Sequence, residues 1–203
     1  PGMATMFLSA NRNKRSVVID LKTGEGAMRA RQLASKADIL IENFRPGVLD
    51  RFGLGYEQLR QTCPQLVYCS ITGYGQSGPF REKGAFDIAI QGMSGIMSVT
   101  GEPDGPPAKC GLPIADYGSA VFAAMSCIVA LRQAERTGQG VRLDVPMLSC
   151  MLALSCLHTS EYWGSGAVPH RMGSAHPTSA PYQAFQGQDG NWFILAAGSD
   201  RLW

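Results

Sequence analysis

The chain has 203 residues, of which 45% are apolar and 17% charged, with a formal net charge of +2. This composition is typical of a globular, core-forming chain, and the small charge with scattered basic residues argues against nucleic-acid binding. No run approaches 18 apolar residues without a polar interruption, so we expect no membrane span.

The first part of the chain alternates between predicted strands and helices. In order, we expect a strand at 16–20, helices at 23–37, 45–51 and 56–63, strands at 38–42 and 66–72, and a helix from about 84 to 99. Because strands that alternate with helices form parallel sheets, this pattern predicts an α/β fold: a Rossmann-like parallel sheet with flanking helices. Ligands bind at the carboxyl ends of such strands, which indicates the loops at 21–22, 43–45 and 72–79.

A long apolar helix is predicted from Ile114 to Arg136, with Gly138 ending it. Apolar residues recur along it at three- to four-residue spacing: Tyr117, Val121, Met125, Ile128 and Leu131. Nearly every position between Ala120 and Leu131 is apolar or small, so we expect this helix to be buried on most sides.

A strand at 141–145 and an apolar helix at 146–163 are predicted to complete this domain. Residues 164–180 are rich in Gly, Ser, His and Pro, which is typical of a linker. A hairpin then uses 182–185 and 192–196, and a helix begins near 199. We therefore expect a large, incomplete domain at 1–163 that lacks its first strand. A linker at 164–180 then leads to the start of a smaller, truncated α+β domain at 181–203.

The cysteines and the first five residues indicate the cellular compartment in which we expect the protein. The six cysteines form no CxxC pair, and several lie in apolar periodic stretches, as buried reduced thiols do. Residues 1–5 lack the basic region and apolar core of a signal peptide. The three histidines have no metal-ligand spacing with the cysteines. We expect a cytoplasmic protein without a metal site or a permanently bound cofactor.

Asp116 stands where the Pro113-bearing loop enters the long helix. Asp is a preferred N-cap residue, so a purely capping role is one interpretation. The N–H groups and dipole of a helix start also keep a half-buried carboxylate ionised, as a carboxylate nucleophile requires. Position alone leaves both interpretations open. The Gly73–Pro79 loop is equally open, since it matches no phosphate-loop motif and suits a surface loop as well.

Several motifs, taken together, resemble the class III CoA-transferase family of the formyl-CoA and carnitine CoA-transferase type. They occur in the family's order: Asn11–Ser16, Asp20–Lys22, Glu42–Gly47, Gly73–Pro79, Ala85–Asp87, Thr100–Pro107, Ile114–Asp116 and Arg136–Gly140. The resemblance implies that Asp116 is the nucleophile and that CoA passes through an aspartyl anhydride and an aspartyl-CoA thioester. It also implies that an oxyanion loop lies outside this chain.

The resemblance further assigns residues and partners. The implied CoA-binding residues are Ile19, Leu21, Lys22, Asn43, Phe44, Arg45, Arg51, Gly84, Ala85, Phe86 and Asp87. The implied substrates are an acyl-CoA, with succinyl-CoA the expected donor, and a carboxylic acid. The family implies an interlocked homodimer of the full-length chain. His170 and Arg171 could meet a distal carboxylate, an idea that rests only on their charge and linker position.

Two other functions remain open. An α-methylacyl-CoA racemase, an isomerase on a related scaffold, would also use an Asp at position 116. It would need a second proton carrier in the Ala85–Asp87 turn, where Phe86 cannot carry a proton. A non-catalytic CoA-binding fragment would keep the Asn43 and Arg51 region and would not depend on Asp116.

Overall fold

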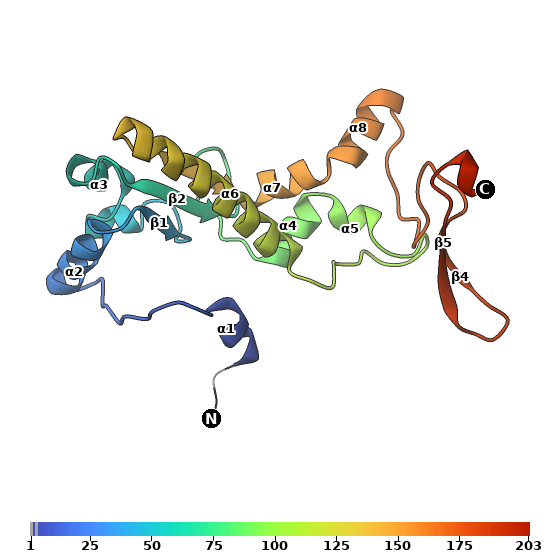
Figure 1. Ribbon diagram of the computed structural model, residues 1–203, viewed down its shortest axis with the longest axis horizontal. Helices are drawn as coiled ribbons and strands as arrows, with labels where there is room; N and C mark the ends of the chain where they lie inside the picture. The colour runs from blue at the N-terminus through green and yellow to red at the C-terminus, as the bar shows by residue number, and fades with distance from the viewer. Residues whose placement is uncertain (1, 3) are drawn as a thin grey trace.

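The computed structural model, which describes residue 2 and residues 4–203, contains a three-stranded parallel sheet, two of whose strands, β1 and β2, are labelled toward the left in Figure 1. The strands of this sheet are β1 (Ile39–Glu42), β2 (Val67–Thr72) and β3 (Arg142–Pro146), in the order β1-β2-β3. The apolar run of β2 is the most buried, as expected for a central strand with covered faces. The predicted Rossmann-like α/β fold is confirmed. The prediction that residues 1–5 form no signal peptide rests partly on residues 1 and 3, which lie outside the described residues.

Helices cover both faces of the sheet because successive strand residues point to opposite sides. On one face, Val67 and Cys69 pack against α6 (Ile114–Thr137) and its neighbours α4 (Asp87–Met93) and α7 (Met147–Leu154). On the other face, Leu40 and Tyr68 pack against α2, α3 and a short 3₁₀ helix. The bounds of these three elements are Gly24–Ala34, Tyr56–Thr62 and, for η1, Leu49–Phe52.

The long helix α6 packs against the sheet through its small residues. Its buried residues are Ala115, Ser119, Ala123, Cys127, Ala130 and Ala134. The bulky residues Tyr117, Val121, Met125 and Ile128 are exposed instead, so the prediction of burial on most sides is wrong. Both stripes have helical spacing. The stripe of small residues faces the sheet because small side chains let the helix approach the strands closely. The helix ends at Gly138, whose φ of +72° suits glycine.

By length and composition alone, the 24 residues of α6 could cross a membrane. The sequence pattern predicts no membrane span. The helix nevertheless passes the length test, because Asp116 lies near its start and no charged residue follows before Arg132. The small-residue face of α6 packs on β2 and β3. Core helices of globular proteins pass the same length test, so α6 is weak evidence for a membrane.

Two predicted elements near the N-terminus differ from the structure. Residues 16–20 are extended but pair with no strand in the part of the chain that the structure describes, and Val18 is 98% exposed. The predicted helix at 45–51 is a turn followed by η1, which ends at Gly53 with φ +69°. A β-branched run needs a neighbouring strand to become a strand, and sequence pattern alone does not supply one.

Two predicted helices are each broken into two. The first is divided into α4 and α5 (Ile96–Val99) at Gly95, whose φ is +83°. The second is divided into α7 and α8 (Cys156–Ser165) at Ser155, whose Oγ donates to the Met151 carbonyl at 2.9 Å. Serine hydroxyls that bond back to a preceding turn compete with the helix, which explains the second break.

The C-terminal hairpin lies far from α2 and α3, at the other end of the molecule (Figure 1). It consists of β4 (Tyr182–Gln186) and β5 (Trp192–Ala196), paired antiparallel as predicted. A 3₁₀ helix, η2 (Asp200–Leu202), follows it, and α1 (Thr5–Ala10) precedes the extended N-terminal segment. The division into a large domain, linker and small domain stays a prediction.

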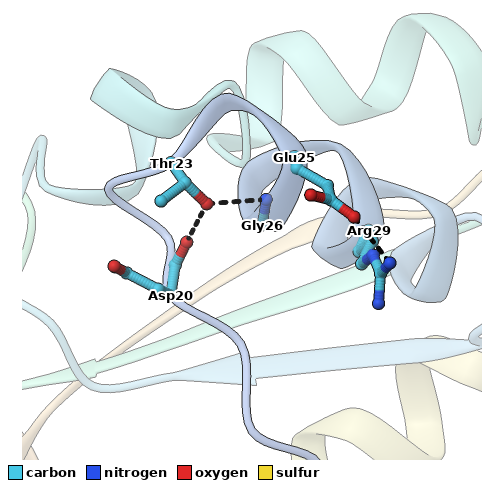
Figure 2. A network of polar contacts seen from close by, with 5 residues as sticks. All are labelled: Asp20, Thr23, Glu25, Gly26 and Arg29. Atoms are coloured by element: carbon cyan, nitrogen blue, oxygen red, sulfur yellow. Dashed lines mark hydrogen bonds and ion pairs between the residues drawn. The ribbon is translucent and has the colours of Figure 1, made fainter.

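The start of α2 is built around Thr23, which occupies its N-cap (Figure 2). Thr23 Oγ1 accepts the N–H of Gly26 at 3.0 Å and donates to the Asp20 carbonyl at 2.9 Å. One side chain therefore satisfies a helix donor and fixes the preceding loop at once. The exposed Glu25–Arg29 pair adds little to stability. This arrangement fixes the path of the predicted CoA-binding residues Leu21 and Lys22.

Candidate functional site

A cavity of about 800 Å³ opens at the carboxyl ends of β1 and β2 and reaches the first turn of α6. Its lining residues are Ile41–Pro46, Ile71–Gly73, Lys83–Asp87, Asp116, Ser119, Ala120 and Met147. A parallel α/β sheet is expected to bind ligands at this edge, because the loops that leave its strands converge there. The lining joins the loop after β1, the turn before α4 and the start of α6 in one concave site.

Asp116 is the third residue of α6, and Pro113 occupies the N-cap. The interpretation of Asp116 as the N-cap is therefore wrong. Its pKa is raised above the ordinary aspartate value, first by partial burial and second by the negative charge of Asp87. Burial and a neighbouring negative charge both disfavour the ionised carboxylate, so its free energy falls when it forms an uncharged ester or anhydride. The geometry therefore suits a carboxylate nucleophile facing a cavity.

Asp87 supplies the cap that Pro113 cannot. Its Oδ1 accepts the backbone N–H of Ala115 at 2.8 Å, and its Oδ2 accepts Nε2 of Gln91 at 2.6 Å. Both carboxylate oxygens are thus engaged within the protein, although Asp87 also lines the cavity. A capping carboxylate at a helix start is stabilised by the free N–H groups and the helix dipole.

The loop after β1 and the turn before α4 contact each other across the cavity wall. The N–H of Phe44 donates to Glu42 Oε2 at 2.8 Å, which fixes the loop at the end of β1. The guanidinium of Arg45 covers Gly84, where an added Cβ would lie 3.0 Å from Nη2. The flexible end of Arg45 thus lies directly on the turn before α4 and forms part of the cavity wall.

Gly73 makes a second close contact in the same wall. A Cβ at Gly73 would overlap the Cβ of Ala85, so the end of β2 and the turn before α4 touch through this glycine. The N–H of Leu148, at the start of α7, donates to the Gly73 carbonyl at 3.1 Å. Three elements therefore meet at one glycine on the cavity lining.

The rest of the Gly73–Pro79 loop is tied to the sheet. The N–H of Gln76 donates to Asp144 Oδ2 at 2.9 Å, and the Gln76 Oε1 accepts Nη2 of Arg142 at 2.8 Å. The N–H of Gly75 donates to Thr72 Oγ1 at 2.9 Å. Because these amides already have partners, the structure favours a structural loop over a phosphate cradle.

The cavity brings together most of the site residues predicted from sequence. Those that line it are Asn43, Phe44, Arg45, Gly84, Ala85, Phe86, Asp87 and Asp116. Ile19 instead lines a separate groove beside α2, and Leu21 packs against the cluster between α2 and α3. Lys22 and Arg51 are exposed outside the cavity lining.

His170 and Arg171 do not line the cavity either. The aliphatic part of Arg171 lies against Gly101, where an added Cβ would be 3.5 Å from Cδ, and the Gly173 N–H donates to the Gly101 carbonyl at 2.9 Å. This segment therefore packs on the loop after α5. A distal-carboxylate role for His170 and Arg171 stays a prediction.

Sequence reasoning missed several residues of the lining, among them Lys83, Ser119 and Met147. Lys83 brings a cation to the cavity, and its Nζ lies 4.3 Å from the ring centroid of Phe80. The position of Met147 could have been anticipated, because it directly follows β3 at the carboxyl edge of the sheet. Among the described residues, no three His, Cys, Asp or Glu side chains cluster so as to hold a metal ion.

Comparison with known proteins identifies the family of the chain. The sequence profile described as CoA-transferase family III matches residues 1–203. The chain is 44% identical to the succinate–glutarate CoA-transferase of Agrobacterium fabrum, over 97% of this chain and 49% of that protein. It is 40% identical to the succinyl-CoA–D-citramalate CoA-transferase of Chloroflexus aurantiacus, over 94% of this chain and 48% of that protein.

Solved structures give the same result for the fold. A CAIB/BAIF family protein from Brucella suis superimposes with a TM-score of 0.87 and 45% identity. The match covers 94% of this chain and 50% of that one. The chain therefore spans about half the length of the relatives it matches.

Proposed function

Because the chain belongs to CoA-transferase family III, we propose that the enzyme containing it transfers CoA from an acyl-CoA thioester to a carboxylic acid. Succinyl-CoA is the proposed donor, since similar proteins are named for reactions of succinate or succinyl-CoA. The observation that carries the proposal is that Asp116 lines one cavity with Asn43–Arg45 and Gly84–Asp87. An acyl-CoA bound along these loops could present its thioester to the carboxylate.

The proposed reaction begins when the Asp116 carboxylate attacks the thioester carbonyl carbon. The C–S bond breaks, CoA leaves as a thiolate, and a mixed anhydride remains on Asp116. The thiolate then attacks the aspartyl carbonyl, which releases the donor acid and forms an aspartyl-CoA thioester. A carboxylate is ionised near neutral pH and needs no general base for this attack.

The second half of the reaction reverses these steps with the acceptor. The acceptor carboxylate attacks the aspartyl thioester, giving a new anhydride and a free CoA thiolate. Attack of that thiolate on the acceptor's acyl carbon gives the new acyl-CoA and restores Asp116. Each intermediate is sensitive to water, so the enzyme must exclude it from the site.

The proposed CoA contacts follow from the cavity lining. Phe44 and Phe86 can pack against the adenine or the pantetheine arm, and Arg45 and Lys83 can pair with phosphates. Ile19, Leu21, Lys22 and Arg51 remain proposed CoA contacts from the family resemblance, although they lie outside this cavity.

The proposal extends to assembly and location. We propose a homodimer of the enzyme, and the apolar stripe exposed on α6 supports contact of this helix with further polypeptide. We place the enzyme in the cytoplasm because its cysteines are free thiols in the structure. We also keep a large domain at residues 1–163, a linker at 164–180 and the start of a small domain from residue 181.

Trapping of the covalent intermediate tests the proposed function. The enzyme, expressed from its complete coding sequence, is incubated with succinyl-CoA, quenched with hydroxylamine or borohydride, and mapped by peptide mass spectrometry. We expect an adduct on the peptide that carries Asp116, absent in Asp116→Ala and retained in the exposed-carboxylate control Asp104→Ala. Intact CoA binding without an adduct would overturn the proposal. Deuterium exchange at the acyl α-carbon would then indicate an isomerase, and its absence a binding role.

A further inference from the structure

Gln91, on α4, is completely buried and joins two segments near Asp116. Its Nε2 donates to Asp87 Oδ2 at 2.6 Å, and its Oε1 accepts the N–H of Cys110 at 2.8 Å. A backbone N–H can only donate, so the atom that faces Cys110 must be the amide oxygen. This fixes the orientation of the amide and leaves its NH₂ group for Asp87.

Asp87 continues this connection to the start of α6. Its other oxygen accepts the N–H of Ala115, the residue immediately before Asp116. Cys110 lies in the loop that leads into the same helix. Gln91 therefore holds the entry loop directly and the first turn of α6 through Asp87. Hydrogen bonds around a completely buried amide restrict the groups they join, so this network favours one arrangement of the entry loop and the first turn.

We propose that Gln91 is a positioning residue for the Asp116 nucleophile. It orients the Asp87 carboxylate toward the Ala115 N–H and ties down the entry loop, so that Asp116 faces the cavity in one orientation. The proposal rests on the proposed function, because it concerns Asp116 as the attacking group. A displacement of about 1 Å in a reacting group can lower the rate by about 100-fold, so a residue that touches no substrate can still control the rate.

The test exchanges donors and acceptors without changing the shape of the site. Gln91→Glu keeps the acceptor for Cys110 but places a second carboxylate against Asp87. We expect kcat to fall by roughly 10- to 100-fold, with KM for the acyl-CoA changed by less than about twofold. In the double variant Asp87→Asn/Gln91→Glu, the amide at position 87 donates to the carboxylate at position 91 and still offers an oxygen to Ala115. We expect kcat to recover to within about fivefold of the wild type.

Two alternative roles for Gln91 predict different results. If Gln91 only fills space, Gln91→Glu keeps its kcat. If only the charge of Asp87 matters, the double variant is no better than Asp87→Asn. Either outcome overturns the proposal. The rate is expressed per molecule that forms the trapped Asp116 adduct, so misfolded protein does not lower it. The exposed change Gln133→Glu on α6 is the matched control and should keep the wild-type rate.

A further variant covers the case in which the double variant does not fold. Gln91→Leu keeps the buried volume and removes both hydrogen bonds, so its kcat per adduct-forming site should fall by at least about tenfold. A kcat within twofold of the wild type would overturn the proposal. If the wild-type enzyme forms no adduct on Asp116, the proposed function falls and this inference with it. If it forms the adduct but the double variant stays inactive, the Gln91 inference alone falls.

Discussion

The Asp87 carboxylate accepts the N–H of Ala115 at 2.8 Å, which places a negative charge beside the residue that precedes Asp116. The pKa of Asp116 is raised by partial burial first and by this charge second. One contact thus caps the helix and makes the proposed nucleophile more basic than an ordinary aspartate. Structure and reactivity are coupled here because the cap and the nucleophile share the same helical turn.

Asp87→Asn should lower the pKa of Asp116, because it removes the neighbouring charge and leaves the burial unchanged. A raised pKa means that, as the pH falls, Asp116 takes up a proton at a higher pH than an ordinary aspartate does. The acid limb of the kcat/KM profile should therefore move to lower pH in the variant. A profile of kcat/KM against pH for the adduct-forming reaction measures this. An unmoved or upward-shifted limb would contradict the prediction, and the exposed control Asp104→Asn should show no shift.

Gly73→Ala should weaken CoA binding, because the added methyl group overlaps the Cβ of Ala85 and displaces a cavity wall. We expect the Kd for CoA, measured by calorimetry, to rise by about tenfold, equivalent to about 1.4 kcal/mol. Gly84→Ala should have a smaller effect, because it meets the flexible end of Arg45.

The double variant Gly73→Ala/Ala85→Gly moves the methyl group from one side of this contact to the other. The volume at the contact is then close to that of the wild type, and CoA affinity should be largely restored. If the double variant bound CoA no better than Gly73→Ala, the loss would have a cause other than this overlap.

Gly26→Ala and Gly24→Ala test the close packing at the start of α2 with the same change two residues apart. A methyl group at Gly26, which lies beside Asp20 (Figure 2), would overlap the Asp20 carbonyl. Gly24 has no heavy atom within 4 Å of an added Cβ. Gly26→Ala should lower the free energy of unfolding by about 1–3 kcal/mol. Gly24→Ala should raise it by about 0.4–1 kcal/mol. Urea unfolding measures both, and equal effects would show that the Asp20 contact carries no strain.

The sequence predicts the sheet and the main cavity loops well, for physical reasons. The strands 38–42, 66–72 and 141–145 are buried apolar or alternating runs, and their pattern requires burial in a sheet. Parallel strands end at one edge, so the strand pattern alone is enough to place the loops at 43–45 and 72–79 together. The Gly84–Asp87 turn does not follow a strand, so only the family motif predicts that it belongs to the site.

The features that the sequence does not predict depend on tertiary contacts. The small and bulky stripes of α6 both have helical spacing, so its periodicity does not show which one meets the sheet. Gln91 has no local signal, because a buried amide and an exposed one look alike in sequence. The extended residues 16–20 carry a strand pattern, but pairing depends on a neighbour that propensity does not specify.

Cysteine labelling tests the packing between β2 and α6. Burial, and after it the neighbouring Cys127, together raise the pKa of the Cys69 thiol to about 12. At pH 8, roughly 1 molecule in 10⁴ would carry the reactive thiolate at Cys69, and access to it is blocked as well. N-ethylmaleimide should therefore label the exposed Cys156 first and reach Cys69 and Cys127 only after unfolding. Peptide mapping over a time course in native buffer and in urea measures this order. Native-state labelling of Cys69 as fast as that of Cys156 would mean that α6 separates readily from the sheet, and the first turn that carries Asp116 would then lack a rigid support.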